Sequence, residues 1–232
     1  MDPVLALDPF ATKGAEYLWV IVFLFALVAY RRALFGRLRP APGLSYAALA
    51  ANAPSRWFDL PGNVFYHPGH TWALPEGGDV VRIGVDDFAQ KLLGRPNALR
   101  LPEVGTRVEQ GERGWQIEVD SRPFDCLSPL GGEVIARNEA VLRAPELVNR
   151  DPYGEGWLLE IRGPKTGSGL RTLMRGELAG AWMSTMERAL FQRMPSEVGL
   201  VMQDGGIPVS GIARALSPRD WERIAGEFLL TR

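Results

Sequence analysis

The sequence predicts a mainly β domain, a small barrel or sandwich with flanking helices. One transmembrane helix is expected before this domain and a small α+β extension after it. Three observations lead to this prediction. Short β-type runs, separated by proline and glycine, follow one another between residues 79 and 163. An uninterrupted apolar run lies near the N-terminus, and the apolar spacing becomes helical after residue 170.

The composition is that of an ordinary globular protein rather than a nucleic-acid-binding or metal-binding one. Apolar residues make up 46%, charged residues 23%, and the formal net charge is -1. Cys126 is the only cysteine, which excludes an internal disulfide and a zinc cluster and fits a reducing compartment. No paired acids, catalytic triad or metal ligands cluster in the sequence. We therefore expect no enzyme activity, no metal and no cofactor.

The apolar run from Tyr17 to Tyr30 predicts a helix that spans a membrane over residues 14–35. Aromatic residues at headgroup level and arginines that reach back to the interface would anchor it: Tyr17, Trp19, Tyr30, Arg31 and Arg32. A cleaved signal peptide is the alternative, but the preceding segment is acidic. The arginines after the run place the N-terminus outside and the main domain in the cytoplasm, on the cytoplasmic membrane.

The chain divides into four segments that differ in composition and pattern. Residues 1–39 form the predicted anchor, 40–60 a linker rich in proline and small residues, 61–185 the β domain and 186–232 the extension. Residues 79–85 alternate as a strand, and residues 86–94 follow as a short helix, with Asp86 or Asp87 as N-cap and Gly94 as C-cap. Further strands are expected in the runs "NALRL", "RVEQGERGWQIEV", "FDCLSPLGGEVIARN" and "GWLLEIRG".

The C-terminal quarter predicts a long helix, a hairpin and a final helix. Apolar residues from Leu170 to Leu190, Leu178 among them, form one helical stripe that Pro195 ends. A hairpin is expected to turn at residues 204–206. The last helix would start with Ser217 as N-cap and bury an apolar face: Trp221, Ile224, Ala225 and Phe228.

Four motifs stand in order from about Val64 to Met183: "FYHPGHTW", "IGVDDFAQKLLG", "LPEVGTRVEQGE" and "LSPLGGEVIARNEAVLRAPELVNRDPYGEGWLLEIR". With these motifs the chain resembles the H protein of the glycine cleavage system, the lipoyl-carrying shuttle of that pathway. The resemblance implies a lipoyl-type barrel sandwich hybrid over residues 61–185. It also implies a β-hairpin whose tip lysine forms an amide with lipoic acid, so that the dithiolane carries an aminomethyl group between enzymes.

This sequence departs from the family at the tip and at a second place. Counting back from the "SP" at residues 128–129 puts the modified lysine on Ser121, and the only lysines are Lys13, Lys91 and Lys165. A serine hydroxyl cannot form the amide, so we expect no lipoyl attachment. Near the first motif the family has "HEW", whose acid helps hold the loaded arm in a cleft.

Here that triplet is His70, Thr71 and Trp72. Both arm and cleft are thus expected to be degenerate, and His70 and Trp72 are interpreted mainly as packing residues. The charged tip, formed by Glu118, Asp120, Ser121 and Arg122, is either a solvated turn or a docking feature. Cys126 on the return strand is expected to be buried.

These features together favour a membrane-anchored, non-lipoylated domain that acts as a structural or docking subunit of a membrane-bound complex. Its partners would be protein subunits and, through the N-terminal helix, the lipid bilayer; no nucleic acid is expected. The alternative is a carrier, decoy or regulator related to the glycine cleavage system that binds the glycine cleavage enzymes. A third reading, an adaptor of the efflux type, requires coiled-coil heptads that the sequence does not contain.

Overall fold

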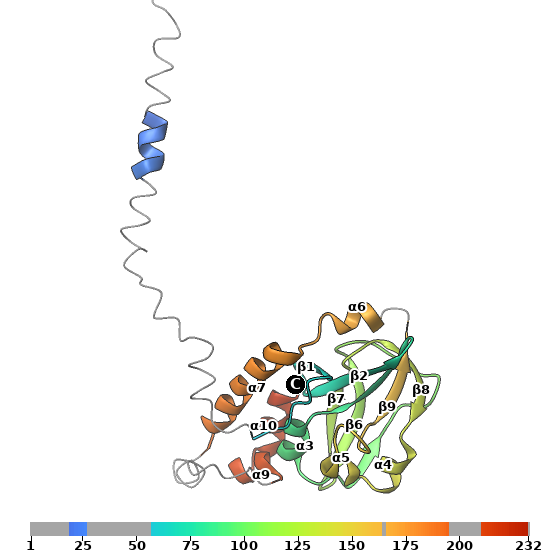
Figure 1. Ribbon diagram of the computed structural model, residues 1–232. Helices are drawn as coiled ribbons and strands as arrows, with labels where there is room; N and C mark the ends of the chain where they lie inside the picture. The colour runs from blue at the N-terminus through green and yellow to red at the C-terminus, as the bar shows by residue number, and fades with distance from the viewer. Residues whose placement is uncertain (1–18, 27–56, 164–165, 195–209, 232) are drawn as a thin grey trace, which may run out of the picture. The chain divides into compact units, whose positions relative to one another are not determined.

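The computed structural model describes residues 19–26, 57–163, 166–194 and 210–231 (Figure 1). The chain separates into two units, Met1–Ala53 and Pro54–Arg232. In the first unit residues 19–26 are helical and exposed. Within the described part of the chain, no helix is both long and apolar enough to cross a bilayer. The spanning helix expected over residues 14–35 lies mostly outside the described residues, as do Tyr17, Tyr30, Arg31 and Arg32, and it stays a prediction.

The second unit is built on two antiparallel sheets, which confirms the mainly β prediction. The larger sheet has the strand order β1-β2-β3-β9-β8-β5. Its strands are β1 (Phe65–His67), β2 (Thr71–Gly77), β3 (Val80–Val85), β9 (Leu159–Arg162), β8 (Gly132–Arg137) and β5 (Arg107–Val108). The smaller sheet has the order β4-β6-β7. It consists of β4 (Ala98–Arg100), β6 (Arg113–Val119) and β7 (Arg122–Leu127).

Alternating apolar residues on the strands face a shared core. On β3, Val81, Ile83 and Val85 are buried, as expected for a strand with one covered face. On β2 the indole of Trp72 is buried opposite Gly84 of β3. A Cβ atom at Gly84 would lie 2.8 Å from that ring, so the glycine makes room for the tryptophan.

Three short helices flank the sheets. The predicted helix is confirmed as α3 (Asp87–Leu93): the Asp86 side chain accepts the Ala89 N–H at 2.8 Å, and Gly94 ends the helix with a φ of 94°. The helices α4 (Glu139–Arg143) and α5 (Leu147–Arg150) were not predicted. They span five and four residues, too few to show a helical apolar period.

The helix expected from Leu170 onward is divided in two, α6 (Thr166–Leu170) and α7 (Gly176–Phe191). Between them, Met174 pairs with Tyr66 as a β-bridge, and this backbone pairing interrupts the helix. The start at Gly176 also corrects the predicted buried stripe. Leu178 is 63% exposed, and the buried positions of α7 are Ala179, Met183, Glu187 and Leu190.

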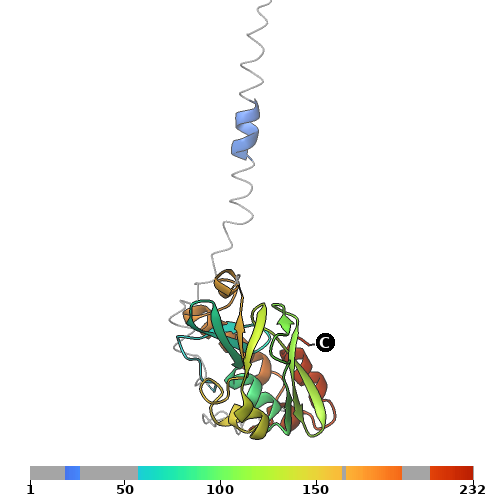
Figure 2. The same ribbon diagram turned by 90° about the vertical axis from the view of Figure 1, so that its right-hand side faces the viewer.

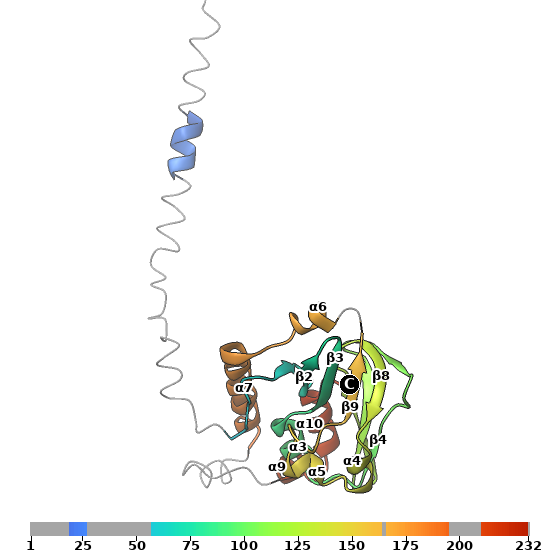
Figure 3. The ribbon, with the colours of Figure 1, turned by 45° about the vertical axis from the view of Figure 1, so that its right-hand side comes forward.

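The C-terminal segment packs on the same domain through α9 (Ile212–Leu216) and α10 (Trp221–Phe228). The predicted hairpin falls largely on residues 195–209, outside the described residues, and α9 was not predicted. The final helix begins at Trp221 rather than after Ser217, and its predicted buried residues are confirmed: Trp221, Ile224, Ala225 and Phe228. Helix α9 lies beside α3, and α10 lies beside α9 and β7 of the smaller sheet (Figures 1, 2 and 3).

The β6–β7 hairpin turns in two residues, because Val119 pairs with Arg122. Asp120 and Ser121 both have positive φ, 48° and 61°. This is the conformation of a type I′ turn, whose twist matches the strands but which favours Asn-Gly. Two non-glycine residues therefore hold left-handed conformations at the tip.

The strain at Ser121 gives a stability prediction. Replacing Ser121 with glycine removes the clash of Cβ in the left-handed region, so the free energy of unfolding should rise by about 0.5–1 kcal/mol. Ser121→Ala keeps a Cβ atom and should stay within about 0.5 kcal/mol of the parent. Urea unfolding of the three chains measures this, and a Ser121→Gly chain less stable than Ser121→Ala would contradict a type I′ tip.

Candidate functional site

The hairpin end carries four residues singled out in the sequence, and its charges are all paired within the chain. Glu118 pairs with Arg100 at 3.3 Å across β4 and β6. Asp120 pairs with Arg214 of α9, and its N–H donates to the side-chain oxygen of Asn97. The remaining pair joins Arg122 to α10.

In that pair the Arg122 guanidinium lies 3.3 Å from Glu222. Ser121 itself is exposed, and neither a histidine nor a lysine is among the described groups that contact it. The sequence-based reasoning missed Arg214 and Glu222 as partners of the tip. The only signal was their place beside the apolar residues that anchor the last helices, as at Glu222 next to Trp221.

The predicted remnant of the arm cleft is buried rather than open. His70, Thr71 and Trp72 are all 0% exposed. The Trp72 indole donates to the carbonyls of Val85 and Pro152, at 2.8 and 3.1 Å. These contacts are those of packing residues, so the three side chains do not line the surface.

His70 is fixed from several sides. Its Nδ1 lies 2.9 Å from the Asp86 carboxylate, and its backbone carbonyl accepts the Asp86 N–H. The imidazole stacks on Phe88 with ring centroids 4.0 Å apart, and Trp182 lies at 4.7 Å. Asp86 thus serves two purposes, as the cap of α3 and as the partner of His70, which sequence reasoning did not connect.

The most specific sequence motif forms hydrogen bonds that hold turns in place. The Asn149 amide of "PELVN" donates to the carbonyls of Gln90 and Gly94 at the end of α3. The carboxylate of Asp151 accepts the N–H groups of Gly154 and of the next residue. These residue types are present because loops need local acceptors and donors.

Tyr153 in the same motif connects the loop to the start of the domain. Its hydroxyl donates to the Asp59 carbonyl at 2.7 Å and accepts the Asp87 N–H at 3.1 Å. Burial raises the pKa of Tyr153, and also that of Tyr66. Both phenols are therefore neutral hydrogen-bonding groups at physiological pH.

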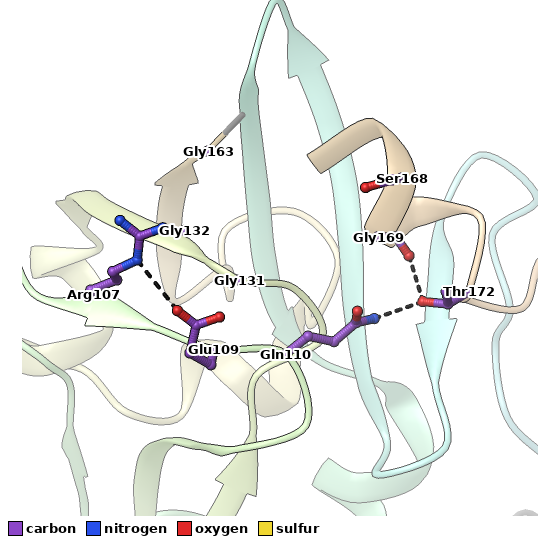
Figure 4. Close-up of a pocket in the computed structure, with 9 residues that line it drawn as sticks. All are labelled: Arg107, Glu109, Gln110, Gly131, Gly132, Gly163, Ser168, Gly169 and Thr172. Carbon is purple, nitrogen blue, oxygen red and sulfur yellow. Dashed lines mark hydrogen bonds and ion pairs between the residues drawn. The ribbon is translucent and has the colours of Figure 1, made fainter. Parts of the chain in front are cut away.

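An open cleft of about 400 Å³ lies at a separate place, between the β5–β8 region and α6 (Figure 4). Its polar side chains bond to one another: Arg107 to Glu109 at 3.3 Å, and Gln110 to Thr172 at 2.8 Å. Its glycines reflect close packing, since a Cβ atom at Gly132 would lie 2.8 Å from a carbonyl oxygen. The cleft is thus accounted for by the fold.

Cys126 is fully buried, as expected. Burial is the main cause that raises the pKa of its thiol far above the usual range. Across the described ranges, no three histidine, cysteine, aspartate or glutamate side chains gather as metal ligands.

The double use of Asp86 yields a prediction. Asp86→Ala removes the cap of α3 and leaves buried His70 without its partner, so the free energy of unfolding should fall by at least about 3 kcal/mol. Asp79→Ala is the control, because Asp79 is 57% exposed and pairs with Arg162 at 3.5 Å. That change should cost less than about 0.5 kcal/mol in chemical denaturation. Equal losses in the two variants would contradict the central place given to Asp86.

The buried cysteine yields a prediction about pH. Because the raised pKa keeps the thiol protonated, iodoacetamide should leave Cys126 unmodified in the folded protein from pH 7 to 9, by intact mass. The same reagent should modify one site per chain in denaturant. Rapid labelling of the folded protein would show that the residue is accessible.

Similar proteins are found among known sequences and solved structures. The family profile described as "Glycine cleavage H-protein" matches residues 64–186. The glycine cleavage system H protein of Thermus thermophilus is 45% identical over 104 residues, 45% of this chain and 80% of that protein. That of Bacteroides thetaiotaomicron is 40% identical over 119 residues, 51% of this chain and 93% of that protein.

Among solved structures, a glycine cleavage system H protein from Mycobacterium marinum matches with 30% sequence identity and a TM-score of 0.46. The match covers 53% of this chain and 98% of that one. The range matched by the family profile runs from just before β1 into α7. Because this range covers more than half of the chain, the chain belongs to the glycine cleavage H-protein family.

Proposed function

We propose that this protein is a member of the H-protein family that carries no lipoyl group and works by binding protein partners, with the enzymes of glycine cleavage as the first candidates. The observation that carries the proposal is Ser121 at the tip of the β6–β7 hairpin. The similar proteins are named as glycine cleavage system H proteins, which supports the choice of partner. The role is that of a decoy or regulator, without catalysis of its own.

The chemistry of attachment supports the first part. An amide with a carboxylic acid requires a primary amine, and the hairpin, residues 113–127, contains no lysine. Lys91 cannot substitute, because its ammonium is engaged with the Trp57 carbonyl at 2.9 Å and the Asp87 carboxylate at 2.8 Å. Lys13 and Lys165 lie outside both the hairpin and the described residues.

A binding role needs only the surface of the domain. The turns of the family motif are held by Asn149 and Asp151, and the core below them is closed around Trp72. A domain that retains the family's motifs but not the acceptor amine can occupy a carrier's site on an enzyme and prevent turnover.

The second candidate is a structural or docking subunit of a membrane-bound complex. The apolar run from Tyr17 to Tyr30 favours it, as a single-pass anchor with the N-terminus outside and the H-protein domain in the cytoplasm. On this reading residues 40–60 are the linker and the partners are other membrane subunits. The absence of an acceptor amine fits this candidate as well, because a docking domain does not carry a group between enzymes.

The first candidate predicts inhibition of glycine cleavage. In a reconstituted system with limiting lipoylated H protein from Thermus thermophilus, an excess of the full chain in detergent should lower the rate at least fivefold. Unlipoylated H protein from the same organism serves as the reference competitor, and detergent alone as the blank. An unchanged rate at saturating amounts of the chain, with the reference competitor active, would contradict binding at the carrier site.

The two candidates separate in what is recovered with the chain after mild detergent extraction of its own membranes. Soluble glycine cleavage enzymes would support the decoy. Integral membrane proteins in a fixed ratio would support the docking subunit. Intact mass of the recovered chain tests the shared part, because a lipoyl adduct on any residue would overturn the absence of a carried group.

A further inference from the structure

We propose that α9 and α10 form an intramolecular clamp, residues 210–231, that holds the end of the β6–β7 hairpin and competes with other proteins for its charged residues. The clamp lies outside the range matched by the H-protein family, residues 64–186. This inference goes beyond the proposed function, because it concerns one surface of the domain and holds whichever partner the protein has.

The apolar half of the clamp covers the side of the hairpin. The indole of Trp221 lies against Phe124 of β7, with ring centroids 4.9 Å apart and planes inclined by 47°. Trp221 is 7% exposed and Phe124 is 5% exposed. A contact of two large aromatic side chains this deeply buried holds α10 on the hairpin.

The polar half of the clamp engages the turn itself. Arg214 pairs with Asp120, and Glu222 pairs with Arg122, so the two residues on either side of Ser121 are bound to different helices of the clamp. The Arg214 guanidinium also lies over the Trp221 ring, 4.8 Å from its centroid. The two ion pairs fix the position of the hairpin tip, and Trp221 supplies the apolar surface that is buried between the clamp and the hairpin.

The far end of the clamp joins the core. Phe228 lies 5.2 Å from Phe88, the ring that stacks on His70. At the other end the N–H of Gly211 donates to the Lys91 carbonyl at 2.8 Å, at the end of α3. The clamp is thus attached at three places: α3, the hairpin, and the cluster around His70.

The geometry has a steric consequence. A protein that recognises the hairpin end has to contact the residues beside Ser121, and both of these are already paired with the clamp. It therefore competes with Arg214 for Asp120 and with Glu222 for Arg122. Small molecules are not subject to this restriction, because Ser121 is exposed.

The first test opens the clamp by charge. Arg214→Glu with Glu222→Arg places like charges opposite Asp120 and Arg122. Hydrogen exchange of the hairpin amides, residues 119–124, should become about tenfold faster than in the parent chain. Adding Asp120→Arg and Arg122→Glu restores opposite charges and should return the exchange to within about twofold of the parent. Unchanged exchange in the first variant would overturn the clamp.

The second test asks whether the clamp excludes a protein. Ser121→Lys supplies an amine at the tip, and a lipoate-protein ligase with lipoate and ATP serves as the probe. Ligation measured by intact mass should be at least tenfold faster when Ser121→Lys is combined with Arg214→Glu and Glu222→Arg, or with Trp221→Ala, than in Ser121→Lys alone.

The control for this test is Ser121→Lys combined with Arg223→Glu. Arg223 is on α10 and pairs with Glu227 of the same helix rather than with the hairpin. This chain should be ligated at the rate of Ser121→Lys alone. Equal rates in all four chains, whether fast or undetectable, would overturn the proposal. The charge variant tests the idea even where Trp221→Ala fails to fold, and neither result depends on binding to glycine cleavage enzymes.

Discussion

The structure depends above all on the buried contact between Asp86 and His70. The Asp86 carboxylate accepts the Ala89 N–H at the start of α3 and lies 2.9 Å from Nδ1 of His70. One side chain therefore joins the turn before β2 to α3. The imidazole stacks on Phe88, and Phe88 in turn contacts Phe58 and Phe228. Phe88 therefore brings together the beginning of the domain, α3 and α10. An unpaired charge there would be costly because neither group reaches water.

Phe228 links this centre to the hairpin end. The same helix that packs on Phe88 also carries Trp221 and Glu222, which contact β7 and the turn. Any movement of α10 would have to disturb the core and the tip together. For that reason the hairpin end is a fixed part of the domain in this chain, and the C-terminal segment is a structural element rather than an independent attachment.

Local signals predicted much of this architecture, and long-range contacts account for what they did not predict. The alternation of β3 and the ends of α3 depend on residues close together in the sequence, and they were predicted, with Asp86 or Asp87 as the N-cap and Gly94 as the C-cap. The interruption before α7 was not, because the bridge between Tyr66 and Met174 joins residues more than a hundred positions apart. Leu178 was consequently assigned to the core although it lies in solvent.

At the candidate site, too, the long-range contacts were not predicted. The resemblance to the H-protein family placed Ser121 at a hairpin tip, by counting back from the "SP" at residues 128–129. Sequence reasoning could not supply Arg214 and Glu222, because ion pairs between distant exposed residues leave no periodic signal. It also described His70 and Trp72 as packing residues, but not the carboxylate to which His70 is bound.

The motif that identifies the family in this chain consists of residues that maintain the fold rather than residues that perform chemistry. The most specific motif here, "PELVN" with "DPYGEGW", provides Asn149, Asp151 and Tyr153, and each of them holds a turn or a helix end through hydrogen bonds. In the proposed function, by contrast, the carrier's chemistry depends on a single amine at the hairpin tip, where this chain has Ser121 with a left-handed φ of 61°. Under that proposal, the chain retains the framework of the family while Ser121 leaves the tip without an acceptor amine.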